Sequence, residues 1–125
     1  MFVRSVKERQ GTEFDVFGKG FESVRLVTKS DNMGYSVNKT IIPKGTKEIW
    51  HYTRHVESCY CIKGSGILTN LETQERHEIS VDTVYNLDKH DRHEFEAIED
   101  VVLISIFNPP LVGQEVHGED GSYEL

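Results

Sequence analysis

The feature that most constrains the fold is a two-residue alternation of side-chain character, which recurs in short stretches along most of the chain. Alternation of this kind is typical of β-strands, because successive side chains of a strand point to opposite faces. Turn-forming groups rich in glycine, proline, asparagine and aspartate separate the stretches, at residues 31–34, 43–45, 63–66 and 88–91. Many short strands at close spacing indicate an all-β sandwich or barrel.

The pattern predicts strands at residues 24–28, 35–42, 48–53, 59–62, 66–69, 76–79, 83–87, 93–97 and 101–107. A short helix could form within the first dozen residues. No internal repeat, low-complexity tract or linker divides the chain. We therefore expect residues 1–125 to form a single domain, which is long enough to bury one core.

Polar side chains share one face of several predicted strands. In a small closed barrel, one face of every strand must look inward. The intervening residues Trp50, Tyr52 and Val56 are bulky and apolar enough to pack elsewhere, so we expect the polar faces to line an interior cavity. These faces consist of Ser36, Asn38 and Thr40 and, if the strand continues past residue 53, of His51, Thr53, His55, Glu57, Cys59 and Cys61.

The charge balance excludes several classes of partner. Lysine and arginine number 14 against 21 aspartate and glutamate residues, a formal net charge of −7. A surface this acidic repels phosphate backbones and anionic lipids, so we expect neither a nucleic-acid nor a membrane partner. The apolar run at residues 101–107 is far shorter than the roughly 20 residues of a membrane span.

The cysteines and the N-terminal stretch indicate a cytoplasmic protein. Cys59 and Cys61 would point the same way on one strand, where a disulfide between them would be strained. We therefore expect two free, buried thiols, as is usual in a reducing compartment. Charged residues interrupt the first nine positions, which lack the apolar stretch of a signal peptide.

One spacing resembles a known motif. It runs Gly45-x5-His51-x-Thr53-x3-Glu57-x6-Gly64. This is similar to the first motif of the cupin superfamily, with threonine in place of the second histidine. The resemblance implies a jelly-roll barrel in which histidine and glutamate residues of the motifs bind a metal ion.

A second stretch supports the same family less specifically. Asp82 and His93 stand where the second cupin motif has its glycine and histidine, but the intervening positions differ. Glu57, His93 and the phenol of Tyr85 would form a mixed oxygen and nitrogen set, which suits Fe(II), Mn(II) or Zn(II). Three protein ligands leave positions open for a substrate oxygen.

Longer stretches match one family within the cupins. They include DNMGYS at residues 31–36, YCIKGSG at 60–66, YNLDKHDRH at 85–93 and FNPPLVGQEVH at 107–117. On these stretches the chain resembles ectoine synthases from end to end. The resemblance implies closure of N4-acetyl-L-2,4-diaminobutyrate to the cyclic amidine ectoine, a compatible solute, with loss of water. It also implies a cytoplasmic, iron-dependent homodimer, with Zn or Mn as other metals that the site could take.

The resemblance also assigns site residues. It implies that Glu57, Tyr85 and His93 are the metal ligands. The family usually has tryptophan where this chain has Phe21 and cysteine where it has Ser105. Its substrate pocket falls on Phe21, Arg25, Asn38, Thr40, Tyr52, His55, Ser105, Phe107, Glu115 and His117.

The chemistry of this cyclisation suggests roles for the pocket residues. An amine must lose a proton before it attacks the amide carbonyl, and His55 or Glu115 could accept that proton. The oxygen must then leave as water, which needs an acid such as Tyr52 or His117. The planar fork of Arg25 suits the substrate carboxylate. Aromatic walls at Phe21 and Phe107 would exclude water.

Two other functions compete with this interpretation. The first is an ectoine-synthase-like cupin that acts on, or merely binds, a different small zwitterionic ligand. The changed wall positions Phe21 and Ser105 are the observation that keeps it open. The second is a cupin dioxygenase or isomerase, which Thr53 disfavours because it removes a histidine ligand.

Overall fold

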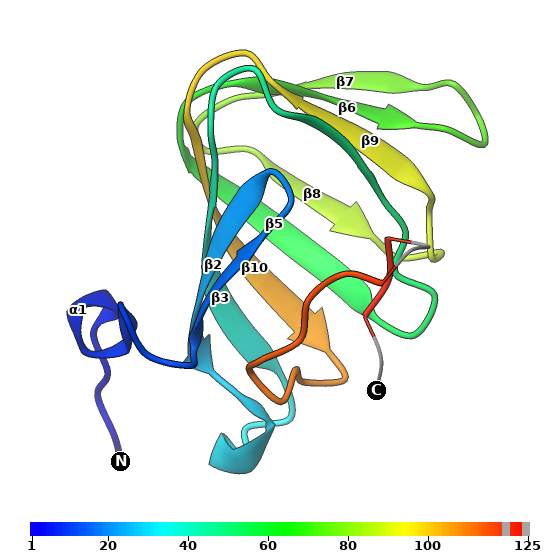
Figure 1. Ribbon diagram of the computed structural model, residues 1–125. Coiled ribbons are helices and arrows are strands. Elements are labelled where there is room, and N and C mark those ends of the chain that lie inside the picture. The colour runs from blue at the N-terminus through cyan, green and yellow to red at the C-terminus, as the bar shows by residue number, and fades with distance from the viewer. Residues whose placement is uncertain (119–120, 124–125) are drawn as a thin grey trace.

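Two antiparallel sheets face each other, which confirms the all-β prediction (Figure 1). The computed structural model describes residues 1–118 and 121–123. The six-stranded sheet has the order β1 (Asp15–Gly18), β2 (Phe21–Val27), β3 (Ser36–Ile42), β10 (Val101–Asn108), β5 (Val56–Lys63) and β8 (Val84–Leu87). The four-stranded sheet has the order β4 (Lys47–Trp50), β9 (His93–Ala97), β6 (Gly66–Asn70) and β7 (Arg76–Ile79).

A short helix precedes the sheets, as predicted. Helix α1 (Val6–Arg9) begins at a capping box, in which the Ser5 hydroxyl accepts a bond from the Glu8 amide at 3.2 Å. A single 3₁₀ turn, Lys29–Asp31, follows β2. In the part of the chain that the structure describes, no helix is long and apolar enough to cross a membrane.

Strand register brings the inward-facing residues into rows across the six-stranded sheet. Ser105 on β10 is paired with Asn38 on β3 and with Cys59 on β5. Tyr85 on β8 extends this row beyond Cys59, and Arg25 on β2 extends it beyond Asn38. Paired residues of antiparallel strands project to the same face. Residues that are up to 80 positions apart, from Arg25 to Tyr85 and Ser105, therefore face one interior.

The prediction for residues 48–53 was wrong in one respect. The strand ends at Trp50, and residues 51–55 form a loop before β5 begins. The loop breaks the alternation, so Trp50 and Tyr52 are buried, whereas Thr53 is exposed. From Glu57 onward, alternate residues of β5 face the interior as expected. The prediction of a polar-lined cavity holds only in part, because Trp50 and Tyr52 of the other face also line it. Of the polar residues, Asn38, Thr40, Glu57 and Cys59 line the cavity, whereas Ser36, His51, Thr53, His55 and Cys61 do not.

Apolar side chains between the sheets form one continuous core, and both thiols lie within it. Cys59 and Cys61 are free and fully buried, as predicted. After β10 the chain turns back toward the loop between β4 and β5 (Figure 1). The amide of His51 donates to the carbonyl of Gly121 at 2.9 Å, and the amide of Thr53 donates to the Ser122 hydroxyl at 3.0 Å. This C-terminal segment therefore closes one end of the space between the sheets.

Two glycines with similar backbone angles separate the effect of strain from that of crowding. Gly64 has φ +81°, and a Cβ there would collide with the carbonyl of Asp100. Gly34 has φ +87°, and a Cβ there would meet nothing within 4 Å. We expect Gly34→Ala to lower the free energy of unfolding by about 1 kcal/mol, the cost of a left-handed alanine.

For Gly64→Ala we expect a further loss of about 2 kcal/mol, because the Asp100 backbone must move. Urea unfolding curves of the two variants and the unaltered protein measure this difference. Equal losses would show that the close approach at Gly64 carries no cost of its own.

Candidate active site

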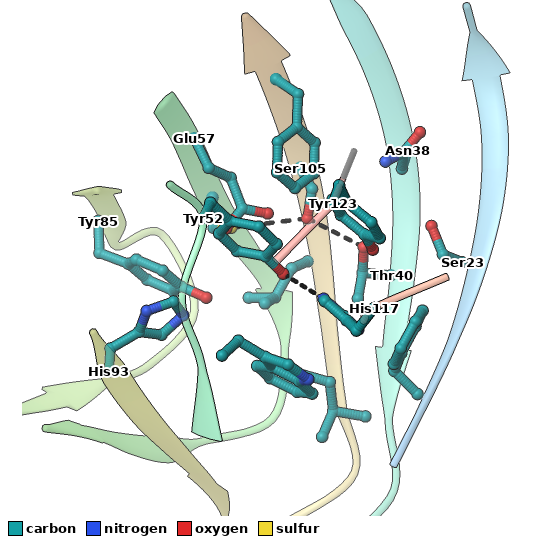
Figure 2. Close-up of a pocket in the computed structure, with 16 residues that line it drawn as sticks. Ser23, Asn38, Thr40, Tyr52, Glu57, Tyr85, His93, Ser105, His117 and Tyr123 are labelled. Carbon is teal, nitrogen blue, oxygen red and sulfur yellow. Dashed lines mark hydrogen bonds between the residues drawn. The ribbon is translucent and has the colours of Figure 1, made fainter. Parts of the chain in front are cut away.

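Ten of the thirteen predicted site residues line one cavity between the sheets (Figure 2). The six-stranded sheet supplies most of them, β9 supplies His93, and the segment after β10 supplies His117. The ten residues are Phe21, Asn38, Thr40, Tyr52, Glu57, Tyr85, His93, Ser105, Phe107 and His117. The free volume is about 20 Å³, which is room for about one water molecule.

Three predicted residues lie behind the cavity wall. His55 is 1% exposed and packs edge-on against Phe107 and Tyr123, at ring-centroid distances of 5.9 and 6.2 Å. Arg25 and Glu115 contact each other outside the lining.

Several lining residues were not predicted. Ser23 and Cys59 lie in register with predicted residues, and the polar alternation already placed Cys59 on the inward face. Trp50 was assigned to the opposite face because the strand was expected to continue. Nothing in the sequence pattern indicated Tyr123, which enters the cavity from the C-terminal segment.

The carboxyl group of Glu57 is buried in the cavity without a counter-charge. Burial raises its pKa to about 7, although hydrogen bonds from Cys59 and Ser105 favour the ionised form. Among residues 1–118 and 121–123, no lysine, arginine or histidine forms an ion pair with it. A bound cation would supply the missing counter-charge and favour the carboxylate.

His93 is held as a metal-ligating histidine would be. Its Nδ1 lies 2.9 Å from the carbonyl oxygen of Asp91, to which a protonated Nδ1 donates. That tautomer leaves Nε2 with a free lone pair. Burial lowers the pKa of His93 to about 4, so the imidazole is neutral near pH 7.

The phenol of Tyr85 completes the donor set, and Figure 2 shows it beside His93 and across from Glu57. Burial raises its pKa well above the usual value, so it is protonated when no metal is bound. No three histidine, cysteine, aspartate or glutamate side chains gather at metal-binding distance in the described part of the chain. Glu57, His93 and Tyr85 together offer two oxygen donors and one neutral nitrogen, which is a mixed donor set of the kind that divalent ions take.

A second polar group lies on the other side of the cavity. Tyr52 Oη and His117 Nε2 are 2.7 Å apart. Burial raises the pKa of Tyr52 well above its usual value and lowers that of His117 to about 3. Near neutral pH both side chains are therefore uncharged, and the Tyr52 hydroxyl can donate its hydrogen bond to an unprotonated His117 Nε2.

Small polar side chains form the floor between these two groups. The hydroxyls of Thr40 and Ser105 are 2.9 Å apart, and the Cys59 thiol lies 3.5 Å from Ser105. Asn38 Oδ1 is buried and has no hydrogen-bond partner among the described residues. An unpaired buried acceptor is costly, so Asn38 is suited to receive an N–H group of a ligand.

Arg25 anchors the C-terminal segment to the sheet. Its Nε donates to Ser23 at 2.8 Å, and its Nη2 donates to the carbonyl of Glu115 at 2.9 Å. The carboxylate of Glu115 accepts bonds from the amides of Val112 and Gly113 at 2.6 and 2.7 Å. These bonds fix the course of the chain that carries His117.

Comparisons with known proteins identify the family of this chain. The ectoine synthase family model matches residues 1–125. A relative from Desulfosudis oleivorans, named L-ectoine synthase, is 44% identical over 126 residues, which cover 100% of this chain and 98% of the relative.

Solved structures agree as well. The crystal structure of ectoine synthase from P. lautus has a TM-score of 0.90 at 37% identity and covers 97% of this chain and 87% of that chain. An RmlC-like cupin from Shewanella frigidimarina, 16% identical, has a TM-score of 0.61 and covers 76% of this chain and 81% of that chain. The second likeness concerns the fold alone, and it confirms the predicted cupin barrel. With the family matched along the whole chain and the fold confirmed, this protein belongs to the ectoine synthase family.

Proposed function

We propose that this chain is an L-ectoine synthase, which closes N4-acetyl-L-2,4-diaminobutyrate to ectoine and releases water. The observation that carries the proposal is the single cavity that gathers ten of the thirteen residues expected for this reaction. Full-length relatives named L-ectoine synthase support the same activity. The two changed wall positions, Phe21 and Ser105, keep an aromatic wall and a small polar side chain at their places in the lining.

Glu57, Tyr85 and His93 would hold the metal, for which Fe(II) is the proposed ion. A neutral imidazole and two oxygen donors suit Fe(II), Mn(II) and Zn(II) alike. Such an ion would supply a Lewis acid for the amide carbonyl, which is otherwise a poor electrophile. The buried Glu57 carboxyl, without a cation nearby, supports this role.

The cavity walls would fold the substrate so that its amine meets its own amide carbonyl. Phe107 and Phe21 offer flat apolar surfaces, and Asn38 offers an unpaired acceptor. Holding the two groups together supplies several orders of magnitude of rate by itself. Since the free volume is about 20 Å³, side chains of the lining must move before the substrate can enter.

Tyr52 and His117 would supply the proton that the departing oxygen needs to leave as water. Their 2.7 Å contact supports Tyr52 as the acid that protonates the departing oxygen, with His117 as its proton partner. His55 and Glu115 would act as bases only if the C-terminal segment shifts, because neither lines the cavity. In the closed arrangement, the contacts of Arg25 with Glu115 support a positioning role, and contact with a substrate carboxylate would require the same shift.

We also infer a cytoplasmic homodimer of single-domain subunits. One core shared by the two sheets supports a single domain at residues 1–125. Tyr60, Val84 and Ile106 are exposed apolar residues on the outer face of the six-stranded sheet and support a subunit contact there. The two free thiols support a reducing compartment. The proposed partner is a small-molecule substrate, not nucleic acid or membrane.

Loss of any metal ligand should remove the metal without unfolding the protein. We expect the Glu57→Ala, Tyr85→Ala and His93→Ala variants each to lose most bound iron while the circular dichroism spectrum is kept. Iron is measured after anaerobic loading and desalting. His51→Ala is the matched control, because His51 belongs to the general cupin pattern but lies outside the cavity lining. Full iron in Glu57→Ala and His93→Ala would contradict the site.

The buried carboxyl group should also make the stability of the metal-free protein depend on pH. The folded state raises the pKa of Glu57 from 4.5 to about 7, so between these pH values the folded protein keeps a proton that the unfolded chain releases. The free energy of unfolding therefore falls as pH rises from about 4.5 to about 7. We expect Glu57→Gln, which does not titrate, to gain about 3 kcal/mol over the unaltered protein across this range.

Urea unfolding of both proteins at pH 5 and pH 8, with chelator, measures this gain. The buried imidazoles contribute equally to both proteins, so they cancel in the difference. A difference independent of pH would show that Glu57 is ionised throughout.

The purified protein, loaded anaerobically with Fe(II), should convert N4-acetyl-L-2,4-diaminobutyrate to ectoine, detected by chromatography. A missing hydrogen bond from an indole at position 21 would cost about 1 kcal/mol, a several-fold rise in KM at most. We therefore expect Phe21→Trp to lower KM. Absence of ectoine from both proteins, with iron bound, would favour the cupin that takes a different zwitterionic ligand.

A further inference from the structure

Trp50, the single tryptophan of the chain, lies inside the cavity without an assigned role. It is the last residue of β4, it is 7% exposed, and it is paired in register with His93 on β9. In the part of the chain that the structure describes, its nearest ring partner is His117, and Phe21 and His93 lie farther away, at centroid distances of 6.0 and 6.4 Å.

The imidazole of His117 packs almost parallel to two aromatic rings. The Tyr123 ring lies 4.4 Å away at 17°, and the indole of Trp50 lies 5.4 Å away at 19°. Phe21 meets the same imidazole edge-on, at 4.9 Å and 77°. Rings packed nearly parallel to the imidazole at these distances limit rotation about its side-chain bonds, because close-packed side chains leave little room to turn.

This restriction sets the direction of the ring nitrogens. With its plane held, His117 presents Nε2 to Tyr52 Oη at 2.7 Å (Figure 2). The backbone supports the same arrangement, since the amide of His51, next to Trp50, donates to the carbonyl of Gly121 at 2.9 Å. A Cβ at Gly121 would lie 3.0 Å from the Cα of Trp50, so the C-terminal segment packs directly on β4.

From this geometry we infer that Trp50 is a positioning residue, which holds His117 at the angle needed for proton transfer through Tyr52. The expected effect on kcat rests on the proposed cyclisation, whereas the expected effect on the orientation of His117 does not. Because Trp50 acts on the proton-transfer pair, its loss should lower kcat more than it raises KM. Small misplacements of catalytic groups can cost up to about a hundredfold in rate.

The kinetic experiment compares two replacements at the same position. We expect Trp50→Leu to lower kcat about tenfold, with KM changed less than about twofold. Trp50→Phe keeps an aromatic face and should retain at least half of kcat. Bound iron should be unchanged in both variants, which separates an effect on His117 from one on His93. A loss confined to KM, or equal kcat for the two variants, would overturn the inference.

Ile79→Ala is the matched control for lost packing. Ile79 is 2% exposed, belongs to the same four-stranded sheet as Trp50 and lies outside the cavity lining. It should lower the free energy of unfolding while kcat is kept. If Trp50→Leu is not recovered in folded form, Trp50→Met takes its place in every comparison.

A second readout does not need turnover. In protein labelled with ¹⁵N-histidine, the ring nitrogens of His117, assigned with the variant His117→Gln, report its tautomer. We expect one dominant tautomer in the unaltered protein and in Trp50→Phe, and mixed values in Trp50→Leu. Unchanged nitrogen shifts in Trp50→Leu would overturn the positioning role. Failure of the unaltered protein to make ectoine would instead overturn the proposed function and leave this result interpretable.

Discussion

The pairing of β10 with β3 on one side and β5 on the other is the constraint on which the site depends. It places Ser105 level with Asn38 and Cys59, and the neighbouring row places Phe107 level with Glu57. A slip of one residue in either pairing would turn the inward side chains of the slipped strand to the outer face. Sheet register therefore positions these side chains, whereas Tyr52 and His117 are positioned by the loop after β4 and by the segment after β10.

Burial determines the charge state of the cavity. Glu57, His93 and His117 have pKa values shifted toward their neutral forms, because removal from water penalises each charged form. A neutral imidazole is a ready metal ligand, and a carboxyl with a pKa of about 7 gives up its proton readily to an arriving cation. The same desolvation that would destabilise isolated charges thus keeps the carboxyl and imidazole groups of the cavity neutral, and it keeps the Tyr52–His117 hydrogen bond between two uncharged groups.

The C-terminal segment completes a cavity that the sheets leave open. It supplies His117 and Tyr123, and it is tied to β2 through the contacts of Arg25 with Glu115. The amides of His51 and Thr53 in the loop after β4 donate to Gly121 and Ser122, and the side chains of Ser122 and Tyr123 are buried. A small closed cavity and a locally held cover are compatible with a reaction that must exclude water.

The sequence by itself determined the all-β class, most strand positions and the inward face of β3 and β5, because period-two alternation reports directly which side chains share a face. Spacing and family resemblance added Glu57, Tyr85 and His93. The tertiary structure decided the features that depend on where a strand ends and where the chain turns back. The strand at residue 48 onward ends at Trp50, which put an indole inside the cavity against expectation, and the C-terminal segment brought in Tyr123. A loop obeys no periodicity, and the place where a returning segment packs depends on the shape of the surface that receives it, so neither could be read from the order of the residues.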